Sequence, residues 1–141
     1  MDAAHPVTTS LPGVALGWVT ALGCDSGPSS GPLLDELSAA CARAVASSGS
    51  EASKARRAAV RDLLRHGSYK PTGRGKPASE YLLNAALEGA FPSINGPVDI
   101  NNLVSVESLL PISLVDLERA GTARFELRYG RPREPYIFNP S

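Results

Sequence analysis

Two polar segments of this sequence have the residue types that could act on a ligand. The first is a Gly- and Pro-rich loop that contains the cations Lys70, Arg74 and Lys76. Exposed amides and cations of this kind can hold a phosphate or the end of an RNA, although the same residues would also suit a flexible, solvated loop. The second is the run Asp99-Ile100-Asn101-Asn102. Its amides could orient a water or hold an ester carbonyl, or the run could simply cap a helix.

The first segment does not complete a nucleotide-binding P-loop. The stretch Gly73-Arg74-Gly75-Lys76 suggests one, but Lys70 occupies the place of the required first glycine. Pro77 replaces the required Ser or Thr. We therefore exclude a nucleotide site of that type.

A basic stripe precedes the loop. Eight of the fourteen Lys and Arg residues lie between Lys54 and Lys76, although the formal net charge of the chain is zero. On the helix expected at 51–66, one face carries a basic stripe of Lys54, Arg57, Arg61 and Arg65. Another face carries alanines and a leucine. Such a local excess suits a polyanion, and the alternative is a solvated helix face.

Other catalytic and metal-binding patterns are missing from the sequence. No Ser/His/Asp arrangement is evident, and His66 is interpreted as structural because it falls in the last turn of the helix expected at 51–66. Cys24 and Cys41 lack CxxC spacing and His partners, so we expect two small buried thiols and neither a metal nor a cofactor. No N-terminal apolar stretch suits a signal peptide or a membrane span, so we expect a cytoplasmic chain without a membrane partner.

These segments must be positioned by a small α+β domain spanning residues 1–141, with a small β structure packed with three or four helices. Pro32 at a first helical position, Ser50 as an N-cap and Gly67 past a helix end mark two helices. The run 98–109 fits a strand or a helix, and we choose a helix because adjacent Asn residues suit a helix start. The expected helices are 32–46, 51–66, 77–89 and 98–109, and the expected strands are 14–22, 112–115 and 122–129.

Three linked motifs resemble a known family. They are YKPTGRGKPASEYLL (69–83), INGPVDINNLVSVE (94–107) and LPISLVD (110–116), followed by Gly121. In order and spacing they are similar to the B3/B4 domain of the phenylalanyl-tRNA synthetase beta subunit, and more closely to free-standing B3/B4 proteins. The core of the resemblance spans residues 69–129.

The resemblance implies binding of tRNA and removal of a wrongly attached amino acid, such as tyrosine, from it. An aminoacyl ester is already activated, so a positioned water and polar groups can suffice for hydrolysis. The family's Val-Asp-x-Thr-Asn motif corresponds to residues 98–102, which assigns catalysis to Asn101 and Asn102. The other implied contacts, for the substrate, are Arg74, Lys76, Glu80, Asp99 and Ser113. For RNA, the basic stripe and the loop predict contacts by Lys54, Arg57, Arg61, Arg65 and Lys70.

Two departures from the family keep other functions open. Ser113 stands where synthetase editing domains often have a His, and the family continues well beyond 122–129 whereas this sequence stops at Ser141. We therefore expect a shortened version, a fragment or an incomplete pocket. The alternatives to a trans-editing hydrolase are a non-catalytic tRNA- or RNA-binding module and a binder of a small amino-acid-like ligand. The sequence leaves open which tRNA or amino acid is involved, and whether a protein partner or oligomer forms.

Overall fold

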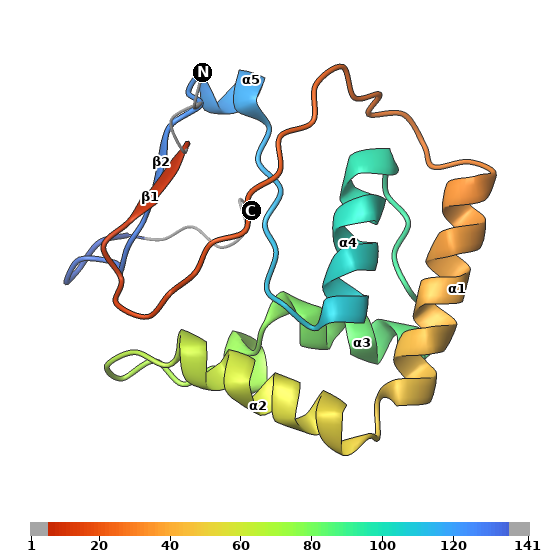
Figure 1. Cartoon of the computed structure of the whole chain (residues 1–141), viewed down its shortest axis with the longest axis horizontal. Coiled ribbons are helices and arrows are strands. Elements are labelled where there is room, and N and C mark those ends of the chain that lie inside the picture. Colours follow the sequence, from red (N-terminus) through yellow and green to blue (C-terminus); the bar gives the residue numbers. More distant parts are fainter. Residues whose placement is uncertain (1–5, 136–141) are drawn as a thin grey trace. The chain divides into compact units, whose positions relative to one another are not determined.

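The computed structural model describes residues 6–135, which belong to two compact units (Figure 1). One unit comprises residues 23–114 and contains four helices; the other comprises residues 6–22 and 115–135 and contains a short helix and a two-stranded sheet. The fold class is α+β, as the sequence predicted. The expectation of a single domain remains a prediction, because two compact units can belong to one domain.

The first two helices begin where their local signals predicted. Helix α1 (Pro32–Ser47) has proline in its first turn and buries Leu37, Ala40 and Ala44. Helix α2 (Glu51–Leu64) is capped by Ser50, whose hydroxyl accepts a hydrogen bond of 3.1 Å from the Ser53 amide. Such a cap satisfies one of the amides that a helix start leaves unpaired.

Helices α1, α3 (Ala78–Leu87) and α4 (Gly96–Ser108) pack on one another in the larger unit. Burial of a leucine side chain contributes about 1.5–3 kcal/mol, so these contacts stabilise the helices more than helix propensity does. At the far end of α4, the buried Ser79 hydroxyl donates 3.1 Å to the carbonyl of Leu109 and ties α3 to α4. The cluster at their contact consists of Ala44, Leu83, Val106 and Leu109.

Two helix boundaries differ from the sequence prediction. Helix α2 ends at Leu64, so His66 lies beyond it, in an isolated bridge with Tyr69. Helix α4 is capped by Asn95, and the predicted cap Asp99 is buried instead. Helix periodicity alone did not place Asp99 in the interior, because its burial depends on partners elsewhere in the chain.

The smaller unit contains a minimal parallel sheet. Strand β1 (Val7–Thr9) pairs with β2 (Phe125–Leu127), with Val7 opposite Phe125. The Thr9 hydroxyl donates 2.9 Å to the Leu127 carbonyl, and the rings of Trp18 and Phe125 lie 6.2 Å apart between centroids. Helix α5 (Leu117–Ala120), which the sequence did not predict, is capped by the Asp116 carboxylate.

The strand predictions were largely wrong. Residues 14–22 and 112–115 form no strand, and only the middle of 122–129 does, because β1 offers three residues to pair with. Val14, Leu16 and Trp18 are partly buried, but Val19 is 90% and Leu22 85% exposed. The alternating burial of residues 14–18 thus occurs although this segment pairs with no other strand.

The fold also bears on the expectations about the cysteines and about membrane-spanning segments. Cys24 is exposed and Cys41 only partly buried, so the prediction of two buried thiols was wrong for Cys24. Burial does raise the pKa of the Cys41 thiol. Within residues 6–135, no helix is long and apolar enough to cross a membrane.

Candidate functional site

The loop between α2 and α3 is held in place by two tyrosines. The Tyr69 hydroxyl donates 2.6 Å to the carbonyl of Gly75, and the Tyr81 hydroxyl lies 3.2 Å from the carbonyls of Gly73 and Arg74. These bonds fix the short 3-10 turn Gly73–Gly75 from both of its ends. The sequence predicted a flexible loop as one alternative, and the structure instead gives it specific anchors.

Both glycines of the turn are required by its geometry. Gly73 has a φ of +57°, a conformation that residues with a Cβ rarely adopt. A Cβ on Gly75 would lie 3.2 Å from the Lys70 carbonyl oxygen and 3.3 Å from the Tyr69 ring. Pro71, two residues before the turn, is also fully buried. The backbone that carries the loop cations is therefore closely packed.

The three loop cations differ in their surroundings. The Lys76 ammonium lies 4.9 Å from the centre of the Tyr81 ring, a cation–π contact. Lys70 and Arg74 are exposed, and in the described part of the chain neither side chain forms an ion pair. Both charges are thus available to an anionic ligand.

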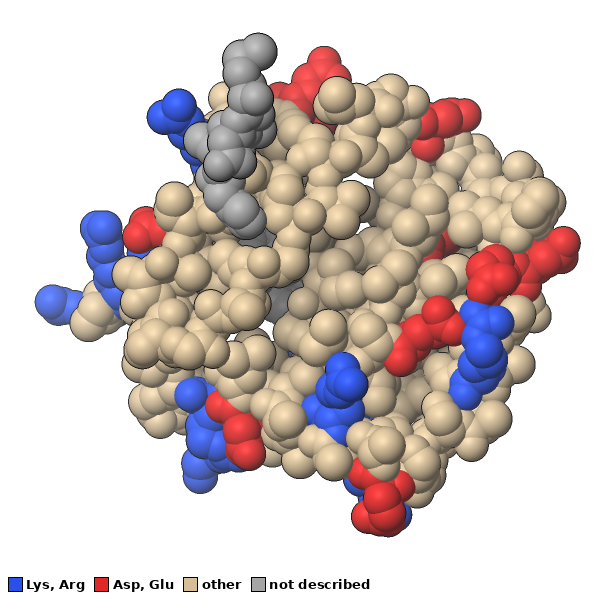
Figure 2. Space-filling view, in the orientation of Figure 1, with Lys and Arg blue, Asp and Glu red and all other residues tan. Residues whose placement is uncertain are grey.

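By contrast, most of the α2 stripe is neutralised by acids. Lys54 pairs with Glu51 at 2.8 Å and Arg65 with Asp62 at 3.4 Å. Arg61 forms a two-pronged pair with Glu80 of α3, at 2.6 and 2.5 Å. On the face drawn in Figure 2, basic and acidic side chains are likewise interspersed. The stripe is therefore a weaker attractor of polyanions than its sequence indicates.

Two predicted contact residues, the buried Glu80 and the partly buried Arg57, are instead engaged by other residues of the helical unit. Glu80 is only 7% exposed, and its hydrogen bond is the main cause that raises the pKa of Arg61. Arg57 donates 3.1 Å to the Ser48 carbonyl, while its buried Nε has no partner in the described structure. Glu80 and Arg57 thus connect helices and turns, and a substrate would have to displace these contacts to reach them.

Asp99 forms a buried polar centre at the start of α4. It accepts bonds from the hydroxyls of Ser29 at 2.6 Å and Ser93 at 2.8 Å, and from the Ile94 amide at 2.8 Å. Burial alone would raise the pKa of Asp99, but these bonds and the Asn95 amide lower it below its usual value. The carboxylate therefore organises the two loops that meet at this helix end.

The two asparagines that follow Asp99 differ from it in being accessible. Asn101 and Asn102 are half-buried, and neither side chain forms a hydrogen bond with the described residues. Ser113 lies exposed in the irregular segment beyond α4. Two neutral amides are therefore free to bind a ligand, whereas Ser113 does not share their helix.

The structure separates the predicted site residues into two groups. The loop cations adjoin the start of α3, which Ser79 ties to Leu109 at the end of α4. Asn102 precedes Leu109 by seven residues, or roughly 10 Å along the helix axis. The loop also lies away from the first turns of α4 in Figure 1. The accessible residues of the predicted set therefore lie at two separate places on the helical unit, whereas Glu80 and Asp99 are buried.

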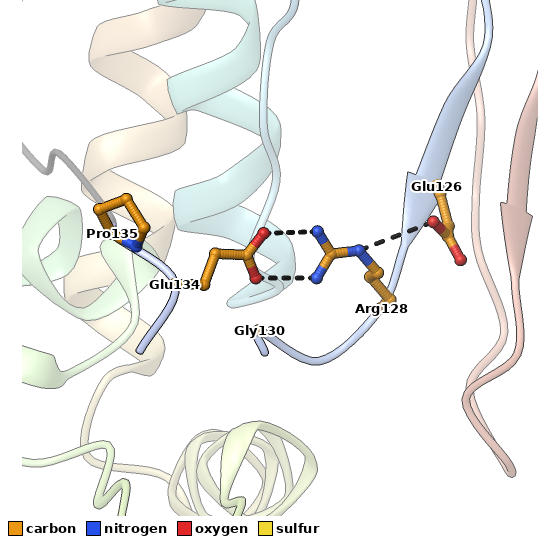
Figure 3. A pocket seen from close by; sticks show the side chains of 5 residues that line it. All are labelled: Glu126, Arg128, Gly130, Glu134 and Pro135. Atoms are coloured by element: carbon orange, nitrogen blue, oxygen red, sulfur yellow. Dashed lines mark hydrogen bonds and ion pairs between the residues drawn. The ribbon is translucent and has the colours of Figure 1, made fainter. Parts of the chain in front are cut away.

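A shallow hollow of about 390 Å³ lies elsewhere, in the smaller unit, and none of its residues was predicted as a site residue. Figure 3 shows Arg128 across it, pairing with Glu134 at 2.6 Å and Glu126 at 3.6 Å. The Arg128 hydrogen bond is the main cause that lowers the pKa of Glu134 to about 2. The charged side chains of the hollow are thus paired with one another. It is lined by Glu126, Arg128, Gly130, Glu134 and Pro135.

No family model matches the chain, and no curated protein or solved structure matches it significantly. The resemblance to the B3/B4 domain therefore remains a prediction from the motifs. Among residues 6–135, no group of three or more His, Cys, Asp or Glu side chains could hold a metal ion.

Proposed function

We propose that this protein binds RNA, with tRNA or aminoacyl-tRNA as its partner, through the loop between α2 and α3. The observation that carries the proposal is the anchored loop with the unpaired cations Lys70 and Arg74. A rigid backbone below two free cations suits phosphate contacts, because little conformational entropy is lost when they form.

The distribution of unpaired groups favours a polynucleotide over a free amino acid. Free cations lie near the start of α3, and free amides lie on Asn101 and Asn102 in the first half of α4. A ligand that contacts both groups must extend over roughly 10 Å or more, given the helical rise. An RNA end can do so, whereas a small amino-acid-like ligand would reach one group only.

A second candidate function, hydrolysis of mischarged aminoacyl-tRNA, is favoured by the unbonded amides of Asn101 and Asn102. Each offers a donor and an acceptor to a water or an ester carbonyl. Asp99 would act here as a positioning residue, because it holds the start of the helix on which both amides lie.

The test is the salt dependence of tRNA binding. Lys70 and Arg74 should be changed together to Ala, since neither side chain forms an ion pair that the fold needs. Each lost phosphate contact makes the slope of log affinity against log salt shallower by roughly 0.7–0.9. The slope of the double variant should therefore be shallower than that of the wild type by about 1.4–1.8.

The matched control is the double variant Arg124→Ala and Arg131→Ala, which removes the same charge from exposed positions of the smaller unit. Its slope should stay close to that of the wild type. Equal slopes for wild type and the Lys70/Arg74 variant, both folded by circular dichroism, would remove RNA from this loop.

A further inference from the structure

The two tyrosines that anchor the loop also present aromatic surface beside its cations. Tyr69 is 48% and Tyr81 45% exposed, although both hydroxyls are hydrogen-bonded to the turn. One side of the Tyr69 ring faces Gly75, whose added Cβ would lie 3.3 Å from it. One side of the Tyr81 ring carries the Lys76 ammonium. Each ring thus has a covered part and an exposed part.

Aromatic surface beside unpaired cations is the combination that binds unpaired nucleotides. Stacked bases need an aromatic face, and their phosphates need cations at neighbouring positions. Lys70 directly follows Tyr69 in the chain, and Arg74 belongs to the turn that both hydroxyls hold. A double helix would use the cations only, because its bases are already stacked.

We infer that the Tyr69–Lys76 loop is a binding site for a single-stranded nucleotide, whose base stacks on Tyr69 and whose phosphates contact Lys70 and Arg74. This inference rests on the proposed RNA-binding function and specifies the part of the RNA that the loop takes. Tyr69 is the preferred platform, because its ring is not shared with a resident cation as the Tyr81 ring is. The rigid turn holds the ring in place before the base arrives.

The test uses a labelled hexauridylate RNA and the same oligomer with abasic positions, bound to the full chain and followed by fluorescence anisotropy. Tyr69→Phe keeps the ring and loses the bond to Gly75, while Tyr69→Leu removes the ring. We expect Tyr69→Phe to bind hexauridylate within about threefold of wild type, whereas Tyr69→Leu should weaken binding by roughly 5- to 150-fold, the range for one stacked base. The exposed Tyr129→Leu is the matched control and should bind as wild type does.

The abasic oligomer separates stacking from a purely structural role of the ring. Without bases, wild type and Tyr69→Leu should bind equally weakly, because only phosphate contacts remain. If Tyr69→Phe loses as much affinity for hexauridylate as Tyr69→Leu does, the ring only braces the loop and the inference is overturned. The same holds if Tyr69→Leu weakens binding of the abasic oligomer as much as it weakens binding of hexauridylate.

Binding of intact tRNA, measured in parallel, distinguishes this inference from the proposed function. Suppose that the salt slope of tRNA binding depends on Lys70 and Arg74, while Tyr69→Leu leaves the affinity for hexauridylate unchanged. The single-strand inference is then wrong, and the proposed RNA binding stands. If neither RNA binds above background, both are wrong.

Discussion

Ser29 and Asp99 are seventy residues apart in the sequence, and the Ser29 hydroxyl donates a hydrogen bond of 2.6 Å to the Asp99 carboxylate. The bond ties the loop before α1 to the start of α4, and the Gly96 amide strengthens the same junction by donating 3.1 Å to the Gly27 carbonyl. Because Asp99 is fully buried, its charge depends on these donors for compensation.

Changing Asp99 to Asn should therefore destabilise the protein by roughly 1.5–3 kcal/mol, the range for hydrogen bonds to a charged group. The Asn side chain has the same shape, but its NH2 group would replace one of the carboxylate oxygens that accept these hydrogen bonds. A donor would then face the donors of the surrounding residues. Urea unfolding should show the loss as a lower midpoint. The control Asp35→Asn lies exposed in the first turn of α1 and should cost less than about 1 kcal/mol. Equal costs for the two variants would contradict a special role for Asp99.

The lowered pKa of Asp99 also predicts how stability changes with acid. A carboxyl whose pKa is lower in the folded than in the unfolded state stabilises the fold above the unfolded value of 3.8. That contribution should decline as pH falls below 3.8 towards the lower folded value. In urea titrations at several pH values, Asp99→Asn should lose less stability in this window than the wild type does. Parallel curves of stability against pH for the two proteins would show that the pKa of Asp99 is the same in the folded and the unfolded state.

The pair between Arg61 and Glu80 predicts a second stability effect. Arg61→Ala would leave the buried Glu80 carboxylate without its partner, which should cost about 1–3 kcal/mol. Arg65→Ala, at the residue that directly follows α2, removes an exposed pair at 3.4 Å and should cost about 1 kcal/mol or less. A double-mutant cycle of Arg61→Ala with Glu80→Ala measures the coupling directly. A coupling energy near zero would show that the pair is only a surface contact.

A further prediction concerns Glu134 in the smaller unit. Its carboxyl should titrate at a pH of about 2, because Arg128 and the Arg131 amide bind its charged form. Carboxyl carbon shifts in NMR spectra report this midpoint. In Arg128→Gln, the midpoint should rise towards 4.5, the ordinary value of the side chain. A wild-type midpoint already near 4.5 would mean that the Arg128–Glu134 pair does not persist in solution.

Local signals explain which parts of the fold the sequence predicted. Pro32 and Ser50 act within one turn of their own helices, so α1 and α2 start where they were expected. The strand at 14–22 was wrong because pairing depends on a distant partner, and β1 pairs instead with Phe125–Leu127. For the same reason the sequence did not show that Asp99 would be buried and hydrogen-bonded to Ser29.

The candidate site was predictable to a similar degree. The cations of the loop and the two asparagines were recognisable by residue type, and the structure leaves Lys70, Arg74, Asn101 and Asn102 accessible. The pairing of Arg61 with Glu80 was not recognisable, because the two residues lie on different helices. The tyrosine anchors were missed, although Tyr69 and Tyr81 flank the glycine-rich turn in the sequence and each carries a hydroxyl that can donate to a turn carbonyl.

The last prediction concerns hydrolysis. If the protein removes tyrosine from mischarged tRNA, the rate should depend on Asn102 more than on Ser113 or His66, because Asn102 has a free amide on the same helix as the buried Asp99. Losing one positioned hydrogen-bond donor typically costs on the order of a hundredfold in rate. Single-turnover release of tyrosine should therefore fall about that much in Asn102→Ala and stay near wild type in Ser113→Ala.

The controls decide between a positioned water and side-chain catalysis. An amide does not change protonation near neutrality, so the rate should vary only weakly with pH there. If His66→Ala or Ser113→Ala alone abolished release, a general base or a nucleophile would replace the positioned-water mechanism. If wild type released no tyrosine above background while still binding tRNA, the two asparagines would serve binding only, and the protein would be an RNA-binding module without catalysis.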